Sequence, residues 1–320
     1  MSYELANIQL NRACYLLRKS KYILVCGHQR PDGDCIGSML ALKLTLNSLS
    51  KRVSCVISDT LPPNLWFLPG IEQIKSGKKK VKKINKFDLI VSLDSSSLER
   101  SGLENLKAST SPVLNIDHHQ DNSLFGSVNI VKLKASSAAE ILYDLLLKFE
   151  IEITRDIATC LLCGIFFDTD AFRNPNTTSH TLEITSQLLS KGACVKKIVR
   201  YLLQEKSLST LRLWGKTLAR LSENKKLGII STVLSEEDIK QSEAGGLEGI
   251  ANYISCLPQA KATLLLSEKD GLIHGNLRTQ RDDVDVSKLA LLFGGGGHKK
   301  AAGFTIPGKL FKTKAGWKVI

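Results

Sequence analysis

Short apolar runs alternate with helical patterns through the first two-thirds of the 320-residue chain. The run Tyr22–Cys26 has the length and composition of one buried strand, and a segment with helical character follows from about Ile36 to Leu49. Further strands are expected at Val53–Ile57, Phe87–Leu93 and Val113–Ile116, and further helices at about 136–149, 155–166 and 178–190. Strands that alternate with helices predict an α/β fold with a doubly wound parallel sheet and helices on both faces.

The pattern changes in the last third, where a smaller α+β domain is expected. A connecting helix is predicted around 195–221, and Lys269-Asp270-Gly271 between two apolar runs predicts a hairpin. Ser235 followed by acidic residues is typical of a helix start, and Gly294 is expected to end a helix over 285–293. We therefore expect a catalytic domain at 1–190, a helical linker at 191–220 and a second domain at 221–320.

The charge balance limits the classes of partner. Lys and Arg exceed Asp and Glu by 13, which favours nucleic acid, nucleotides or an anionic membrane surface as ligands. Seven lysines lie between Lys75 and Lys86 with no acidic residue among them; they form either a solvated loop or an electrostatic funnel for a phosphate-rich substrate. Neither a membrane span of about 18 apolar residues nor a secretory signal is recognisable, so we expect a cytoplasmic protein without a membrane partner.

The eight cysteines are expected to be reduced thiols. Cys160 and Cys163 form a CxxC pair, but no second pair lies at zinc-site spacing, and the surrounding residues are apolar. We interpret both as core residues.

Aspartate and histidine side chains gather where the predicted strands end. One cluster follows the first strand within Gly27–Ser38, Asp94 ends the third strand, and Asp117-His118-His119 ends the fourth. Ligands of open parallel sheets bind beyond the carboxyl ends of the strands. Each residue alone could be a helix cap or a satisfied core group, but together they predict one crevice that holds His28, Asp32, Asp34, Asp94, His118, His119 and, from a helix end, Asp168.

Several carboxylates in one crevice repel each other unless cations neutralise them. Mixed histidine and aspartate ligands suit Mn²⁺, with Mg²⁺ or Co²⁺ possible. Six ligands are too many for one ion that keeps open positions, but they suit two ions about 3.5–4 Å apart, bridged by a shared carboxylate. The predicted reaction is in-line attack of hydroxide on phosphorus.

A second signal is the run Gly294–Gly297 followed by His298. Consecutive glycines let backbone N–H groups approach an anion closely, although such a run can also be only a flexible loop. Arg278 lies on a predicted strand, where it either binds a phosphate through two hydrogen bonds or is an ordinary exposed arginine.

These motifs together resemble the DHH phosphoesterase superfamily, which includes RecJ-like exonucleases. Asp117-His118-His119 matches the triplet that names the family, residues 27–38 match its first motif, and residues 294–304 match its C-terminal glycine motif. Within the superfamily the chain is most similar to the NrnA-type bifunctional oligoribonucleases, which also dephosphorylate 3′-phosphoadenosine 5′-phosphate. The resemblance covers nearly the whole chain.

The resemblance implies a role for each matched position. One metal ion would be held by His28, Asp32 and Asp94, and the other by Asp34, Asp94, His118 and Asp168. His119 would face the scissile phosphate, and the substrate end would be held in a cleft between the domains by Arg278, Gly295, Gly296, Gly297 and His298. A homodimer is plausible. The family commonly has Asp-Thr-Gly where this chain has Asp168-Thr169-Asp170, and we expect Arg173 to offset the added charge.

Two alternatives remain open. The same chemistry could act on linear dinucleotides from cyclic-dinucleotide turnover or on single-stranded DNA. The chain could also be a non-catalytic nucleic-acid binder that keeps metals for structure. Against the second alternative, every matched catalytic position holds the expected residue, and aromatic residues, on which single-strand binders stack bases, make up only 6% of the chain.

Overall fold

The computed structural model describes residues 3–79, 81–242, 247, 249–313 and 316–320. The chain forms two compact units, Met1–Glu205 and Lys206–Ile320. The boundary between the units falls inside the range 191–220. Among the described residues, no helix combines the length and the apolar character that crossing a bilayer would require.

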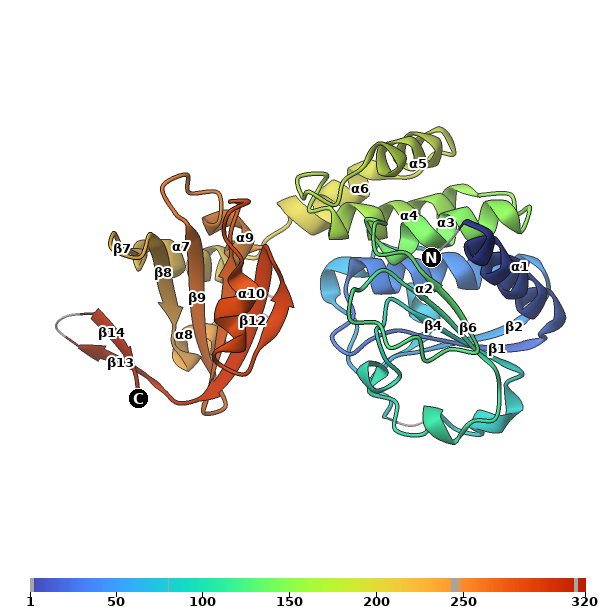
Figure 1. Ribbon diagram of the computed structural model, residues 1–320, viewed down its shortest axis with the longest axis horizontal. Helices are drawn as coiled ribbons and strands as arrows, with labels where there is room; N and C mark the ends of the chain where they lie inside the picture. The colour runs from blue at the N-terminus through green and yellow to red at the C-terminus, as the bar shows by residue number, and fades with distance from the viewer. Residues whose placement is uncertain (1–2, 80, 243–246, 248, 314–315) are drawn as a thin grey trace. The chain divides into compact units, whose positions relative to one another are not determined.

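The first unit contains a six-stranded parallel sheet, which confirms the predicted α/β class (Figure 1). The strands are β1 (Tyr22–Cys26), β2 (Arg52–Val56), β3 (Ile74–Lys75), β4 (Leu89–Leu93), β5 (Val113–Asp117) and β6 (Val128–Val131). Their order is β3-β2-β1-β4-β5-β6, and every pairing is parallel. The order reverses between β1 and β4, so the carboxyl ends of these strands form the switch point where such sheets bind ligands.

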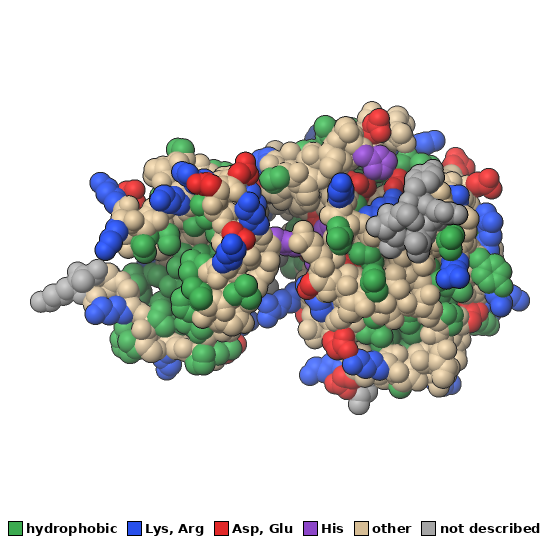
Figure 2. Space-filling view, in the orientation of Figure 1, with side chains coloured by type: hydrophobic (Ala, Val, Ile, Leu, Met, Phe, Trp, Pro, Cys, Tyr) green, Lys and Arg blue, Asp and Glu red, His purple; other side chains and the backbone are tan. Residues whose placement is uncertain are grey.

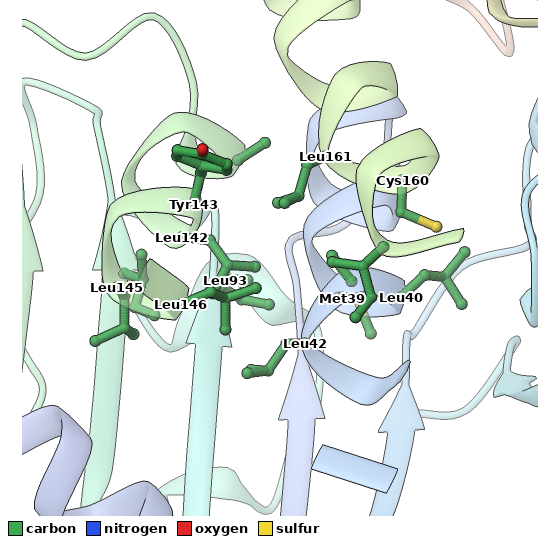
Figure 3. Packing of buried hydrophobic residues seen from close by; sticks show 14 of the residues in the cluster. Met39, Leu40, Leu42, Leu93, Leu142, Tyr143, Leu145, Leu146, Cys160 and Leu161 are labelled. Atoms are coloured by element: carbon green, nitrogen blue, oxygen red, sulfur yellow. The ribbon is translucent and has the colours of Figure 1, made fainter. Parts of the chain in front are cut away.

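Four helices pack on one face of this sheet: α1 (Tyr3–Lys19), α2 (Gly33–Ser48), α3 (Ala138–Lys148) and α4 (Arg155–Asp168). Helix α2 is apolar nearly all round, as expected of a helix that is covered on every side. Figure 3 shows Met39, Leu40 and Leu42 of α2 among side chains of β4, α3 and α4. Cys160 and Cys163 of α4 are fully buried there, which confirms that they are core residues.

The opposite face differs from the expectation of helices on both sides. In the part of the chain that the structure describes, it is covered by irregular segments with the 3₁₀ turns η3 (Ile84–Lys86) and η5 (Leu106–Ala108). Val81, Ile84 and Phe87 pack on this face. Their spacing of three residues fits a 3₁₀ turn, and the lysines between them leave too few apolar residues for an amphipathic α-helix.

The expected connecting helix is interrupted. After α5 (Ser179–Ser190), the chain forms α6 (Val195–Val199), a π-helical turn η6 (Arg200–Gln204) and then α7 (Leu208–Ala219). Ser207 has extended backbone angles, and its side chain accepts a hydrogen bond from the Thr210 N–H, so it starts a new helix. Ile198 belongs to the core of the first unit and Leu213 to a core of the second.

The second unit is an α+β structure around a mixed sheet of order β11-β12-β10-β9-β8-β7. The strands are β7 (Ser222–Asn224), β8 (Ile229–Leu234), β9 (Ala262–Lys269), β10 (Leu272–Arg278), β11 (Gly296–His298) and β12 (Ala301–Pro307). Helices α8 (Glu236–Lys240), α9 (Ile250–Ile254) and α10 (Val286–Leu291) pack with it, and β13 (Leu310–Thr313) pairs with β14 (Gly316–Val319). The predicted β9–β10 hairpin and the Ser235 helix cap are confirmed.

Candidate metal centre

The turn between β1 and α2 positions two of the expected ligands. Asp32 caps α2, because its Oδ1 accepts hydrogen bonds from the N–H groups of Asp34 (3.0 Å) and Cys35 (3.1 Å). Its other oxygen, Oδ2, lies 3.7 Å from Nε2 of His28. The cap therefore holds Asp32 in place while one carboxylate oxygen faces the site.

Asp34 is fully buried in the first turn of α2 and reaches a second helix. Its Oδ2 accepts a hydrogen bond from the N–H of Ala138 (2.6 Å), and its Oδ1 accepts one from the N–H of Ala139 (2.9 Å). These are the first amides of α3, where the helix dipole favours a negative charge. Asp34 thus links the start of α2 to the start of α3.

Asp94 lies at the centre of the cluster, directly after β4. Its Oδ2 is 3.3 Å from Nε2 of His28, and its Oδ1 is 3.6 Å from both Nε2 of His118 and Nδ1 of His119. The residue has a left-handed backbone (φ 55°) and is only 2% exposed. The strained turn aims the carboxylate back over the ends of the strands.

Asp168 completes the cluster from the last position of α4. Its Oδ2 lies 3.1 Å from Nε2 of His118. Two asparagine side chains hold this helix end, because Asn174 (3.0 Å) and Asn176 (3.3 Å) both donate to the main-chain oxygen of Asp168. The structure therefore brings together all seven residues that the sequence placed in the crevice: His28, Asp32, Asp34, Asp94, His118, His119 and Asp168.

Asp117, which was expected only as part of the Asp117-His118-His119 motif, has a contact of its own in the site. Its Oδ1 lies 2.7 Å from Nδ1 of His119, and its Oδ2 accepts a hydrogen bond from Asn122 (2.5 Å). Asp117 is fully buried. It orients the His119 ring. The sequence could have indicated this contact between Asp117 and His119, because side chains at positions i and i+2 after a strand can meet in a turn.

The electrostatics of the cluster favour added positive charge. Burial disfavours the charged form of His118, but Asp168 and Asp94 outweigh burial and raise the pKa of His118 to about 12. Burial raises the pKa of Asp168 to about 6 against the opposing effect of His118. Burial and the nearby carboxylates Asp94 and Asp168 also raise the pKa of Asp34. The site thus contains more buried carboxylate than its histidines neutralise.

The donor set fits divalent metal ions. Ligand atoms of Asp94, His118 and His119 lie within 4.8 Å of one another, as do those of Asp34, His118 and Asp168. Oδ1 of Asp94 is buried and has no hydrogen-bond partner among the described residues. An unpaired buried carboxylate oxygen is costly unless a cation binds it. Aspartate and imidazole groups are ligands that Mn²⁺ and similar ions accept.

A thiol also borders this cluster. Sγ of Cys35 lies within 4.8 Å of ligand atoms of His28 and Asp94. Burial raises the pKa of the Cys35 thiol well above its usual range, which favours the neutral form. We therefore do not count it among the metal ligands.

The expected substrate-binding residues lie in the second unit. In the sheet register, Arg278 of β10 and His298 of β11 both pair with Ala301 of β12, so the three residues form one row across neighbouring strands. Nε of Arg278 donates to Oδ1 of Asn252 (3.0 Å). The arginine and the histidine therefore stand near each other at one edge of this sheet.

The glycine run forms an edge strand with little space around it. Gly297 has φ 138°, and a Cβ there would lie 2.6 Å from the carbonyl oxygen of Ala301. A Cβ at Gly295 would collide with the carbonyl oxygen of Gly303, whereas Gly296 faces open space. Among the described strands, β11 pairs only with β12, so one side of its backbone has no strand beside it in that part of the chain. An anion could approach N–H groups on that side.

Asp170 departs from the family pattern at a position where the backbone explains the usual glycine. Its φ is 48°, and Ala171 and Phe172 are also left-handed. Arg173 donates to Oδ1 of Asp170 (2.8 Å) and to its main-chain oxygen (2.9 Å). The expectation that Arg173 offsets the added charge is confirmed.

The fold and this site define a class, and the chain belongs to the DHH family of phosphoesterases, which are metal-dependent hydrolases. The family model for the N-terminal DHH domain matches residues 22–165, and the DHHA1 domain model matches residues 228–315. The chain is 31% identical over 286 residues to the bifunctional oligoribonuclease and PAP phosphatase NrnA of Thermus thermophilus, covering 89% of this chain and 84% of the relative. The predicted resemblance is thereby confirmed.

Two solved structures support the same fold. An exopolyphosphatase-related protein from Bacteroides fragilis superimposes with a TM-score of 0.87 at 27% identity, covering 93% of this chain and 91% of that protein. RecJ of Thermus thermophilus, solved in complex with Mn²⁺, has a TM-score of 0.55 at 14% identity and covers 93% of this chain and 52% of that protein. At that identity the second likeness concerns the fold alone.

Proposed function

We propose that this chain hydrolyses short oligoribonucleotides to mononucleotides and converts 3′-phosphoadenosine 5′-phosphate to AMP, using two bound divalent ions, with Mn²⁺ the preferred metal. The substrates are those named for the Thermus thermophilus relative, whose alignment covers 89% of this chain and 84% of the relative. The net charge of +13 suits anionic substrates of this kind.

The proposed metal ligands follow the geometry of the cluster. His28, Asp32 and Asp94 would hold one ion, and Asp34, Asp94, His118 and Asp168 the other, with Asp94 shared. Bound divalent ions would neutralise phosphate oxygens and lower the pKa of a water molecule toward neutrality. The observation that carries the proposal is Oδ1 of Asp94, which is buried, has no hydrogen-bond partner among the described residues and lies 3.6 Å from ring nitrogens of both His118 and His119.

The other steps of the proposed reaction, proton donation and substrate binding, are assigned to further residues of the chain. Asp117 and Asn122 hold His119 so that its Nε2 can donate a proton to the leaving oxygen or stabilise charge on the phosphate. Arg278, Gly295, Gly296, Gly297 and His298 would bind the terminal phosphate of the substrate through backbone N–H groups and charged side chains.

The test is Mn²⁺-dependent release of mononucleotides from di- to pentanucleotides and of phosphate from 3′-phosphoadenosine 5′-phosphate. Asp94→Ala should lower kcat/KM by at least about a thousandfold, since it removes the shared ligand. Asp156→Ala, which removes an exposed carboxylate from the start of α4, should change kcat/KM by less than about twofold. Hydrolysis confined to linear dinucleotides or to single-stranded DNA would favour those substrates, and RNA binding without hydrolysis would favour the non-catalytic alternative.

A further inference from the structure

The lysine-rich segment is anchored to the first unit. Val81, Ile84 and Phe87 are 5–9% exposed and pack on the sheet face opposite α2. The side chain of Asn105 fixes the segment further, because its Oδ1 accepts from the N–H of Val81 (2.9 Å) and its Nδ2 donates to the Val81 oxygen (2.8 Å). The lysines between these anchors therefore project outward from a fixed backbone.

We call the described, exposed lysines of this segment the basic ridge: Lys75, Lys78, Lys79, Lys82, Lys83 and Lys86. Among the residues that the structure describes, none of these six forms an ion pair with a carboxylate; Lys86 lies over the ring of Phe87 instead. Lys and Arg side chains occur over both units (Figure 2), so positive charge alone does not single out this ridge. Its position relative to the metal centre does.

A cavity of about 560 Å³ is lined both by a lysine of the ridge and by the residue that follows the proposed ligand His28. One wall contains Gln29, whose main-chain oxygen lies 2.6 Å from Nδ1 of the proposed ligand His28. Another wall contains Lys79 of the ridge. The cavity therefore runs from the residue next to the metal centre to the basic ridge, entirely within the first unit.

The lining of this cavity suits the uncharged parts of a nucleotide. Oγ of Ser58 is buried there without a hydrogen-bond partner among the described residues, and the Gln29 amide adds donors and an acceptor. On the same wall, Glu99 is paired with Lys107. The lining carries the carboxylates of Asp59, Glu99 and Glu104 against the ammonium groups of Lys79 and Lys107. It therefore disfavours a phosphate and suits an uncharged ribose or base, whereas the ammonium groups of the ridge favour phosphate.

We propose that the basic ridge binds the phosphates of single-stranded RNA that continues away from the scissile bond, with a ribose or base in the adjoining cavity. This inference rests on the proposed function and adds to it a binding surface for the part of the substrate that is not being cleaved. It makes the rate depend on RNA length and on salt. A dinucleotide ends before the ridge and gains nothing from it.

The test compares a dinucleotide with a heptanucleotide in the full-length, metal-loaded protein. The variant replaces Lys78, Lys79, Lys82 and Lys83 by Ala, and the matched control replaces Lys148, Lys191, Lys196 and Lys197, which are equally exposed but belong to the helices on the other side of the sheet. The ridge variant should lower kcat/KM for the heptanucleotide by about tenfold or more at low salt. It should also reduce the magnitude of the slope of log kcat/KM against log salt by up to about 3, since each of the four lost phosphate contacts contributes about 0.7.

The possible outcomes distinguish a failure of the basic-ridge proposal from a failure of the proposed function. The inference holds if the dinucleotide rate changes by less than about twofold in the ridge variant and the control leaves both substrates unaffected. Equal losses for both RNA lengths, equal losses in the control, or loss of binding only to phosphatidylserine vesicles would overturn it. Failure of the unmodified protein to cleave even the dinucleotide would instead overturn the proposed function.

Discussion

Nδ1 of His119 lies 2.7 Å from Oδ1 of the fully buried Asp117. Burial disfavours the charged His119 ring, but this carboxylate more than compensates and raises the pKa of His119. A buried carboxylate on Nδ1 fixes both the orientation and the tautomer of the ring. In the proposed reaction, His119 held in this way would donate a proton to the oxygen that leaves phosphorus.

Replacing Asp117 by Asn should therefore lower kcat most for substrates whose leaving group must be protonated. We expect kcat for a dinucleotide, whose leaving group is a poor alkoxide, to fall by about 10²–10³, and kcat for a p-nitrophenyl nucleotide ester to fall by less than about threefold. Steady-state kinetics on both substrates provide the measurement. Equal losses on both would mean that Asp117 has only a structural role.

The crossing of α2 and α4 depends on Gly37. A Cβ at this position would collide with the main-chain oxygen of Cys160 and lie 3.2 Å from the N atom of Gly164. Gly37→Ala should lower the free energy of unfolding by about 1–3 kcal/mol, because the backbone clash exceeds the helix-propensity gain of about 1 kcal/mol. Urea unfolding followed by circular dichroism measures the change.

The matched control for this substitution is Gly215→Ala in α7, where no atom lies within 4 Å of the added Cβ. This variant should be unchanged or up to about 1 kcal/mol more stable. A Gly37→Ala protein as stable as the Gly215→Ala protein would show that α2 and α4 can separate without cost.

Asp238 makes the stability of the second unit depend on pH. Burial would raise its pKa, but Arg220 and Lys216 hold the pKa of Asp238 below its usual range. Because the folded pKa is depressed, the stabilisation is present above the unfolded value of about 3.9 and is lost as pH falls below it. Asp238→Asn should cost on the order of 1–3 kcal/mol at pH 7.

The same variant should match the unmodified protein once the carboxyl group is protonated in both states. Thermal unfolding of the two proteins from about pH 7 downward tests this, and the difference in Tm should shrink progressively below about pH 4, where the unfolded chain takes up the proton first. A difference that stayed constant with pH would assign the loss to the helix cap at Ser235, to which Asp238 also bonds.

The site was predictable because its residues follow strands that the sequence makes obvious. Tyr22–Cys26 is apolar throughout, and the structure places β1 at these five residues. Once β1, β4 and β5 are neighbours in a parallel sheet, His28, Asp94 and His118 must meet at their carboxyl ends. Convergence of the cluster followed from topology and did not depend on side-chain detail.

The features that the sequence did not predict are short elements, or they depend on contacts between residues far apart in the chain. Strand β6 at Val128–Val131 has only four residues with an asparagine among them, so its pattern resembles a loop. The second face of the sheet is covered by 3₁₀ turns whose apolar residues alternate with lysines, which no helical period could indicate. The break before α7 depends on one serine cap in an otherwise helical stretch.

The number of Mn²⁺ ions bound per chain tests the central claim most directly. Titration of the metal-depleted protein, followed by isothermal calorimetry and elemental analysis, should give two ions per chain for the unmodified protein and for Asp156→Ala. Asp94→Ala, which lacks the shared carboxylate, should hold at most one, with affinity reduced by at least about a hundredfold. Two ions bound equally well by Asp94→Ala, or none bound by the unmodified protein, would contradict the account.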